Sequence, residues 1–271
     1  MVVSEPVSAG DIRSRAGPDP DAASATIVLI PARLKATRLP DKPLLPIGGE
    51  PMIVHVWRRA VEAGLGPVVV ACAEEAIAAA VTAAGGEAVL TDPDLPSGTD
   101  RIFQALGRLD PGRRFGRVVN LQGDLPVLEP EALRRVVEPL DRLGTDMATL
   151  ATATEDEAEM ANPNVVKAVV SFTPDDPGLG RALYFTRATA PSGPGPVHHH
   201  IGIYAFTRDA LERFAGLAPS PLERRERLEQ LRALENGMSI GVRLVDAVPF
   251  GVDTPEDLER ARAVLEGGVG R

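Results

Sequence analysis

Short apolar runs alternate with segments of helical period through the first half of the chain. Residues 26–30 are almost continuously apolar, as in a strand buried on both faces of a sheet. From Pro51 to Gly64, apolar residues recur every three or four positions, the pattern of an amphipathic helix. The same alternation predicts strands at 68–71, 87–91 and 117–121 and helices at 74–84, 99–109 and 131–143. Such an order favours βαβ units, and hence a mostly parallel sheet with helices on both faces.

The second half of the chain is less regular. Its pattern predicts strands at 147–153, 165–171, 181–186, 200–206 and 239–248, a charged amphipathic helix at 222–235, and a final helix capped by Thr254. With no internal repeat and no clear linker, we expect one α/β domain over residues 25–266. It should have a Rossmann-like mixed, mostly parallel sheet and an elaborated second half. Residues 1–24, rich in Pro, Asp, Ser and Gly, are predicted to form a disordered extension, and 267–271 a loose tail.

Composition narrows the class of protein. The 271 residues include 38 acidic and 29 basic ones, a formal net charge of −9, which disfavours a broad nucleic-acid-binding surface. No run of 18 apolar residues and no secretory signal pattern occurs, so we expect no membrane insertion. The single cysteine, Cys72, excludes an internal disulfide and fits a reducing compartment. These features predict an acidic cytoplasmic protein.

The loop after the first predicted strand gathers basic residues. Arg33, Lys35, Arg38 and Lys42 lie within ten residues of one another in an otherwise acidic chain. Neither a Walker A motif nor G-x-G-x-x-G occurs, which excludes the two commonest phosphate-binding motifs and argues against a Rossmann dehydrogenase. An Arg/Lys cluster at the carboxyl end of a parallel strand can still hold a triphosphate. The alternative is a solvated loop whose charges only confer solubility.

Two aspartates also follow predicted strands. Asp124 ends the segment NLQGD and Asp253 ends GVD. Mg²⁺ sites use one or two carboxylates together with substrate phosphates, so these residues and the basic loop predict a phosphoryl-transfer site if the fold brings them together. Taken alone, each aspartate could simply cap a turn. In the same way, the small residues of Ser97-Gly98-Thr99 would let a flat ring approach the backbone, yet they equally suit the start of a helix.

These segments match those of a known family. The chain resembles the 3-deoxy-manno-octulosonate (KDO) cytidylyltransferases, or CMP-KDO synthetases, of the nucleotide-diphospho-sugar transferase superfamily. The matches run in order from about residue 25 to 265 and include IPAR (30–33), TRLPDKPL (37–44), PMIVHV (51–56), SGT (97–99), NLQGD (120–124), ALYFTRAT (182–189), HIGIY (200–204), LEQLR (228–232) and GVDTPEDL (251–258). The first loop and the Asp124 turn are shared across related nucleotidyltransferases. The segments around Arg187, His200 and Glu229 are more particular to the KDO enzymes.

The resemblance implies the superfamily fold, a homodimer, and transfer of CMP from CTP to the anomeric 2-hydroxyl of KDO for lipopolysaccharide biosynthesis, with release of pyrophosphate. It implies catalytic roles for Arg33, Lys42, Asp124 and Asp253, with Mg²⁺ held by the two aspartates. The residues implied to bind CTP are Ala32, Arg33, Arg38, Lys42, Ser97, Gly98, Thr99, Arg101 and Asp124. Those implied to bind KDO are Gln122, Arg187, His200, Tyr204, Glu229 and Gln230.

The chain departs from the family pattern in three places. Leu125 stands where glutamate is usual, His199 stands where arginine is common, and the segment at 192–197 is shorter than in many relatives. We therefore keep two alternatives open. One is a cytidylyltransferase for another sugar acid, such as sialic acid or an amino-KDO. The other is a regulatory protein that binds a nucleotide sugar without turnover.

Overall fold

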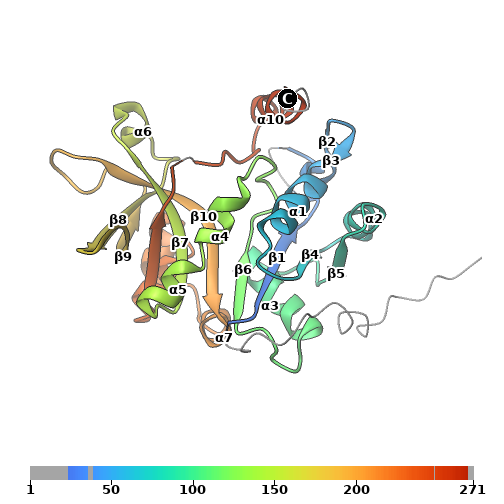
Figure 1. The fold of residues 1–271 in the computed structure, drawn as a ribbon, viewed down its shortest axis with the longest axis horizontal. Coiled ribbons are helices and arrows are strands. Elements are labelled where there is room, and N and C mark those ends of the chain that lie inside the picture. The colour runs from blue at the N-terminus through green and yellow to red at the C-terminus, as the bar shows by residue number, and fades with distance from the viewer. Residues whose placement is uncertain (1–23, 36–38, 247, 268–271) are drawn as a thin grey trace, which may run out of the picture.

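A single mixed sheet runs through the part of the chain that the structure, a computed structural model, describes: residues 24–35, 39–246 and 248–267 (Figure 1). Its strand order is β5-β4-β1-β6-β10-β7-β11-β9-β8. The strands are β1 (Thr26–Ala32), β4 (Val68–Cys72), β5 (Glu87–Leu90), β6 (Arg117–Asn120), β7 (Met147–Thr154), β8 (Lys167–Thr173), β9 (Asp176–Thr186), β10 (Val197–Thr207) and β11 (Ile240–Leu244).

The direction of the strands divides this sheet into two parts. In the first half of the chain β1 pairs in parallel with β4 and β6, and β4 pairs in parallel with β5. In the second half β10 is antiparallel to β6 and β7, β7 is parallel to β11, and β8 and β9 form an antiparallel hairpin. The predicted α/β class with a mixed sheet is therefore confirmed, and the antiparallel pairings belong to the elaborated second half.

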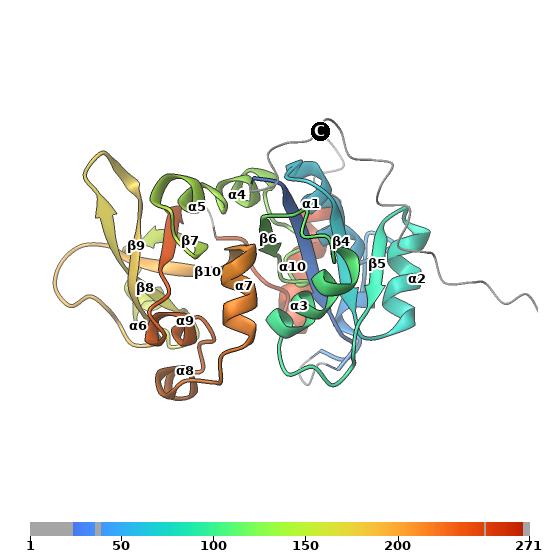
Figure 2. The ribbon, with the colours of Figure 1, turned by 90° about the horizontal axis from the view of Figure 1, so that it is seen from below.

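Helices cover both faces of the sheet (Figure 2). One face carries α1 (Met52–Ala63), α4 (Pro130–Arg135) and α5 (Glu138–Leu143), and the other carries α3 (Gly98–Leu109) and α7 (Arg208–Ala215). The remaining elements are the 3-10 turn η2 (Lys42–Leu44), the small hairpin β2 (Pro46–Ile47) and β3 (Glu50–Pro51), and the helices α2 (Glu75–Ala83), α6 (Glu157–Ala161), α8 (Pro221–Glu226), α9 (Leu231–Glu235) and α10 (Pro255–Gly267).

Two predicted helices are wrong as single elements. The segment 131–143 divides into α4 and α5, because Pro139 lies in the first turn of α5 and has no N–H to continue the hydrogen bonds of α4. The segment 222–235 divides into α8 and α9, because Arg227 adopts a left-handed conformation, with a φ of 57°, that is typical of a helix end. Helix α7 and the hairpin β2–β3 have no counterpart among the predicted elements.

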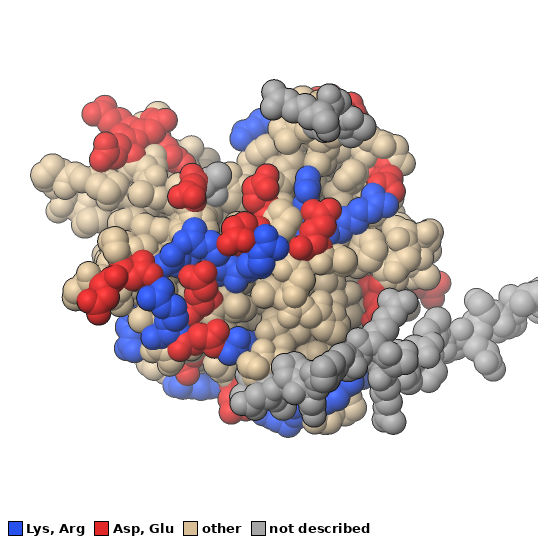
Figure 3. Space-filling view, in the orientation of Figure 1, with Lys and Arg blue, Asp and Glu red and all other residues tan. Residues whose placement is uncertain are grey.

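The structure describes little of the two ends of the chain. Of the predicted extension 1–24 only Ser24 is described, and of the predicted tail 267–271 only Gly267, the last residue of α10. Within the described ranges, no helix combines the length and the apolar character needed to cross a membrane. Acidic and basic side chains are interspersed over the face seen in Figure 3, as expected for a mixed surface without one dominant charge.

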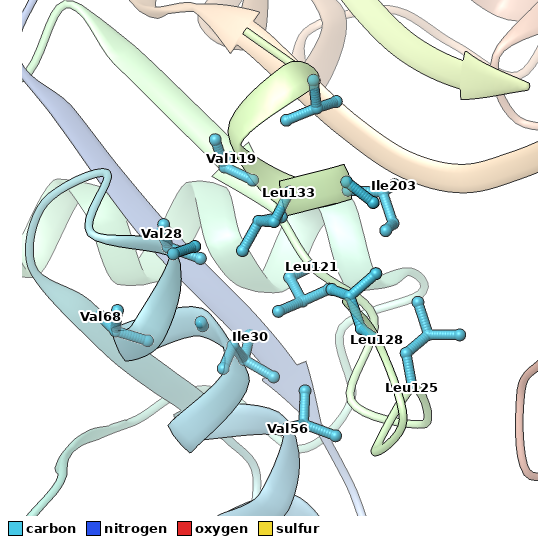
Figure 4. Packing of buried hydrophobic residues seen from close by; sticks show 14 of the residues in the cluster. Val28, Ile30, Val56, Val68, Val119, Leu121, Leu125, Leu128, Leu133 and Ile203 are labelled. Carbon is cyan, nitrogen blue, oxygen red and sulfur yellow. The ribbon is translucent and has the colours of Figure 1, made fainter. Parts of the chain in front are cut away.

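Strand β1 lies at the centre of the core and contributes to both of its faces. Val28 and Ile30 belong to a cluster that includes residues of α1 and α4 (Figure 4), whereas Ile27 and Leu29 belong to a second cluster with residues of α3 and α7. These four side chains are at most 1% exposed. The prediction of a strand buried on both faces is confirmed, and this rigid strand carries the basic loop at its carboxyl end.

Candidate active site

A cavity of about 390 Å³ opens where β1 and β6 end. Four segments that are distant in sequence meet around it: the loop after β1, the start of α3, the turn after β6 and the residue before Thr254. The lining residues are Pro31, Ala32, Arg33, Lys35, Leu39, Lys42, Pro43, Leu95, Ser97, Gly98, Arg101, Gln122, Gly123, Asp124 and Asp253. The fold thus brings the basic loop and both aspartates to one place, at the sheet edge where open α/β proteins bind ligands.

Lys42 joins the two aspartates. Its Nζ lies 2.8 Å from Oδ2 of Asp124 and 3.0 Å from Oδ1 of Asp253. The side chain of Lys42 is 17% exposed, against 30% for Asp124 and 48% for Asp253, so the ammonium is the most sheltered member of the three. Burial lowers the pKa of Lys42, but the two carboxylates outweigh it and the net pKa is raised. Lys42 therefore stays charged between them.

The local backbone explains how Asp253 reaches Asp124. The N–H of Val252 donates to the backbone oxygen of Asp124 at 2.9 Å, and Val252 is buried in a small cluster with residues of α1 and α10. The carboxylate of Asp257 accepts hydrogen bonds from the N–H groups of Asp253 and Thr254, at 3.1 and 3.0 Å. The Thr254 hydroxyl accepts from the N–H of Asp257 at 3.2 Å, so the predicted cap of the final helix is confirmed.

The two aspartates fit a divalent cation that is also held by phosphates. In the described part of the chain, no three His, Cys, Asp or Glu side chains gather as a metal site. Asp124 and Asp253 offer carboxylate oxygens, which are hard ligands, and they already face one positive charge on Lys42. Mg²⁺ commonly takes only one or two protein carboxylates and completes its shell with water and substrate phosphates.

The start of α3 both caps a helix and lines the cavity. Ser97 accepts from the N–H of Asp100 at 3.1 Å, so the capping interpretation is confirmed. Gly98 has no Cβ, and a Cβ at this position would lie only 3.2 Å from Cγ of Pro31. Glycine therefore lets the backbone of α3 lie close to Pro31 in the cavity wall. Arg101 is only 2% exposed; its Nη1 donates to Thr91 and to the backbone oxygen of Asp92, while its Nη2 is buried with no partner among the described residues. Because Arg101 lines the cavity, this nitrogen is a candidate donor for a polar ligand.

Thr99 points away from the cavity and toward the second half of the chain. Gln122, on the cavity wall, donates to Asn120 at 3.2 Å, and Asn120 donates to Thr99 at 3.4 Å. Thr99 in turn donates to Oε2 of Glu229 at 2.7 Å. Asn120 is 2% exposed and was not singled out from the sequence, although it stands in the NLQGD segment. The available signal in the sequence was that Asn120 is a polar residue at the end of an otherwise apolar strand.

Glu229 is a half-buried carboxylate. Burial raises its pKa, and the hydrogen bonds from Thr99 and Ser97 offset only part of that effect. Its Oε1 is buried without a hydrogen-bond partner in the described structure, and so is Nε2 of the neighbouring Gln230. Buried polar atoms without partners are uncommon and costly, so these two atoms are candidates to contact a polar ligand.

Arg187 directly follows β9 and is held by backbone oxygens. Its Nε donates to the oxygen of Glu226 at 2.9 Å and its Nη1 to that of Pro163 at 3.0 Å. The fully buried Lys167 donates to the backbone oxygen of Arg187 at 3.1 Å. Two of the three guanidinium nitrogens of Arg187 are therefore fixed, which orients the group for a further acceptor.

His200 and Tyr204 lie on β10, beneath the surface. His200 is 8% exposed, and burial lowers its pKa to about 3, so its ring is neutral. Burial also raises the pKa of the Tyr204 hydroxyl well above its ordinary value. Their rings lie 5.6 Å apart, and Phe185 packs edge-on against His200 at 4.9 Å.

The predicted site residues thus form two groups. All the residues implied to bind CTP line the cavity except Thr99 and Arg38. Arg38 lies outside the described residues. Of those implied to bind the sugar acid, Gln122 lines the cavity. His200 and Tyr204 lie on β10, Arg187 directly follows β9, and Glu229 and Gln230 lie between α8 and α9. The departing residue Leu125 is 7% exposed and packs with Leu128 (Figure 4), and His199 pairs with Glu159 at 2.6 Å.

Comparison with known proteins gives concordant matches. A family model described as cytidylyltransferase matches residues 27–240. A 3-deoxy-manno-octulosonate cytidylyltransferase of Paramagnetospirillum magneticum is 62% identical over 240 residues, which are 89% of this chain and 97% of that protein. The one of Parvibaculum lavamentivorans is 62% identical over 239 residues, 88% and 92% of the two chains. A solved CMP:2-keto-3-deoxy-manno-octonic acid synthetase, complexed with CTP, superimposes with a TM-score of 0.83 and 38% identity over 90% of this chain and 100% of that chain.

Proposed function

This chain belongs to the cytidylyltransferase family, and we propose that it transfers CMP from CTP to the anomeric 2-hydroxyl of KDO, giving CMP-KDO for lipopolysaccharide biosynthesis. The reaction forms a bond between the 2-oxygen of KDO and the α-phosphorus of CTP. It breaks the bond from that phosphorus to the β-phosphate, so pyrophosphate leaves and the hydroxyl proton is released. The relatives named for this activity match 88–89% of this chain at 62% identity.

The observation that carries the proposal is the meeting of Lys42, Asp124 and Asp253 in the cavity. Phosphoryl transfer of this kind needs positioned charges more than a covalent catalyst. Lys42 and Arg33 would neutralise the triphosphate, and Arg38 would join them. Because Lys42 is fixed by two carboxylates, its charge is oriented before the substrate binds, which reduces the reorganisation that the reaction requires.

We propose Mg²⁺ as the cofactor, held by Asp124 and Asp253. When bound, the ion would neutralise charge on the phosphates of CTP and favour the departure of pyrophosphate. Its two protein ligands are the carboxylates that now share Lys42.

The nucleoside and the sugar acid would occupy the two groups of residues described above. Ala32, Ser97, Gly98 and Arg101 would frame the cytidine, with the unpartnered Nη2 of Arg101 as a donor. The sugar acid would lie between Gln122 and the second group, that is Arg187, His200, Tyr204, Glu229 and Gln230, with Arg187 on its carboxylate. Thr99 would connect the two groups, because its hydroxyl donates a hydrogen bond to Glu229.

The test is pyrophosphate release from CTP and Mg²⁺, measured with and without KDO. Release that depends on KDO supports the proposal. If pyrophosphate is released with N-acetylneuraminate or an amino-KDO but not with KDO, that other sugar acid is the substrate and not KDO. Tight CTP binding without release for any of the three would contradict it and favour the regulatory alternative. A cytoplasmic location and a homodimer remain part of the proposal. The location rests on the composition of the chain and would be tested by fractionation; the homodimer rests on family resemblance and would be tested by sedimentation.

A further inference from the structure

Thr149 is a buried threonine on β7 at the point where the pairing of β7 with β10 becomes irregular. The register shifts between Ile201 and Tyr204, which leaves backbone groups of β10 outside the regular ladder. The Thr149 hydroxyl, with no exposed surface, lies 3.0 Å from the oxygen of Ile201 and 2.8 Å from that of Ile203. It also lies 3.0 Å from Nε2 of His200.

The single hydrogen of the Thr149 hydroxyl determines which tautomer of His200 fits this site. A hydroxyl has one hydrogen to donate and two lone pairs to accept with. Both backbone oxygens can only accept, so the single hydrogen of Thr149 is directed to them. The third contact is then satisfied only if Nε2 of His200 carries a hydrogen and donates it to the Thr149 oxygen. If Nε2 accepted instead, both backbone oxygens would face the hydroxyl oxygen without a hydrogen between them.

We propose that Thr149 is a positioning residue that fixes the Nε2–H tautomer of His200 and so leaves Nδ1 as a hydrogen-bond acceptor for a hydroxyl of the sugar acid. In a neutral imidazole one nitrogen donates and the other accepts, so fixing Nε2 fixes both. The use of Nδ1 by a sugar acid rests on the proposed function; the tautomer itself does not.

The surroundings of the ring support a fixed orientation. Phe185 packs edge-on against His200 with an interplanar angle of 67°, and the ring of Tyr204 lies 5.6 Å from that of His200. Burial keeps the ring neutral, as its pKa of about 3 indicates, so it does not become a double donor at physiological pH. Tyr204 pairs in register with Asn120, whose side chain accepts from Gln122 of the cavity. The histidine thus belongs to the framework that adjoins the cavity.

The experiment compares wild type with Thr149→Val and Thr149→Ser. Valine keeps the size of the side chain and removes the hydroxyl, whereas serine keeps the hydroxyl. With ¹⁵N-labelled histidine at about pH 7.5, NMR reports which ring nitrogen carries the hydrogen, and a His200→Gln sample assigns the signals among the four histidines. We expect Nε2–H in wild type and Thr149→Ser, and a mixture or Nδ1–H in Thr149→Val. The KM for KDO should rise about tenfold in Thr149→Val with the KM for CTP unchanged.

Several outcomes would overturn the inference. These are an Nδ1–H signal in the wild type, an unchanged tautomer in Thr149→Val, or equal increases in both KM values, which would indicate a merely structural role. If Thr149→Val does not fold, the wild-type and Thr149→Ser signals still decide the tautomer, and the KM of Thr149→Ser must stay within about twofold of wild type. If the wild type releases no pyrophosphate with any sugar acid, the proposed function fails, and the ring signals alone then decide the inference.

Discussion

Thr99, in the first turn of α3, donates a hydrogen bond of 2.7 Å to Glu229, which follows it by 130 residues. The bond ties the wall of the cavity to the second group of predicted residues, because Thr99 also accepts from Asn120 and Asn120 accepts from Gln122. A half-buried carboxylate at such a junction is a weak point for stability, since its charge has lost part of its hydration. A carboxylate that weakens the fold in this position is a candidate for a role in binding rather than in folding.

Glu229→Gln should stabilise the protein at high pH and impair its activity. Because burial raises the pKa of Glu229, the native state binds that proton more tightly than the unfolded chain. The favourable contribution is present below the ordinary carboxyl pKa of 4.5 and is lost as the pH rises through the raised value. Glutamine has no such loss, so we expect a melting temperature about 2–4 °C higher at pH 8, and little change at pH 4.

The control for this substitution is Glu87→Gln, at an exposed position of β5. It should change the melting temperature at neither pH. Steady-state kinetics should show that kcat/KM for KDO falls at least tenfold in Glu229→Gln and is unchanged in the control. An equal change in melting temperature at pH 4 and pH 8 would contradict the assignment of the effect to the ionisation of Glu229.

Asp124→Asn should abolish most of the turnover and leave the fold intact. The amide keeps the size of the side chain, and the carboxylate is 30% exposed, so its loss removes little packing. It removes one of the two carboxylates that orient Lys42 and that would hold Mg²⁺. Losing one preorganised electrostatic group in an active site lowers kcat about 10²- to 10³-fold.

Pyrophosphate release and thermal unfolding together test this prediction. The matched control is Asp175→Asn, on the exposed turn between β8 and β9, which should retain wild-type kcat. Wild-type turnover in Asp124→Asn would refute the assignment of Asp124 to the metal. Chelation of Mg²⁺ by EDTA should stop the wild-type reaction, and added Mg²⁺ should restore it.

Arg187→Ala should raise the KM for the sugar acid and change that for CTP little. Arg187 lies in the second group of residues and does not line the 390 Å³ cavity. A charge-assisted hydrogen bond is worth about 1.5–3 kcal/mol, which corresponds to about a 10- to 100-fold increase in KM. Arg181→Ala, at an exposed position of β9, is the control and should alter neither KM. Equal increases for both substrates would remove Arg187 from the sugar-acid site.

The sequence predicts the first half of the fold well because its signals there are local. In β1 every residue from Ile27 to Ile30 is buried, so an apolar run and a buried strand coincide. The breaks at Pro139 and Arg227 were missed for different reasons. Pro139 was visible in the sequence, but the apolar period continued across it, and a left-handed conformation at Arg227 has no signal in its residue type.

The candidate site shows a similar division. The basic loop, Asp124 and Asp253 could be named from local motifs, but their meeting at Lys42 depends on the packing of Val252 beneath them. Thr149 could not be named at all. It lies within an apolar strand, and only the irregular register of β10 shows what its hydroxyl contacts. Such partners follow from tertiary structure and not from spacing.

Asp110→Ala should destabilise the protein without affecting catalysis. Asp110 ends α3 with a fully buried side chain, which accepts from the N–H groups of Arg114 and Phe115 at 3.0 Å each and from Arg208 of α7 at 2.8 Å. Burial would raise its pKa, but these hydrogen bonds outweigh burial and lower it below the ordinary 3.8. Removing one partner of a buried ion pair costs about 3–5 kcal/mol of unfolding free energy.

The pH dependence of that loss separates the ion pair from simple packing. Since the pKa of Asp110 is lowered, its contribution is fully present above 3.8 and disappears as the pH falls through the lowered value. Urea unfolding should therefore give the same difference between wild type and Asp110→Ala at about pH 7 and pH 5, and a smaller one at about pH 3. Asp141→Ala, which breaks an exposed ion pair, should cost less than about 1 kcal/mol at pH 7. A difference for Asp110→Ala that is the same at all three pH values would show that lost packing, and not the charge of Asp110, accounts for the destabilisation.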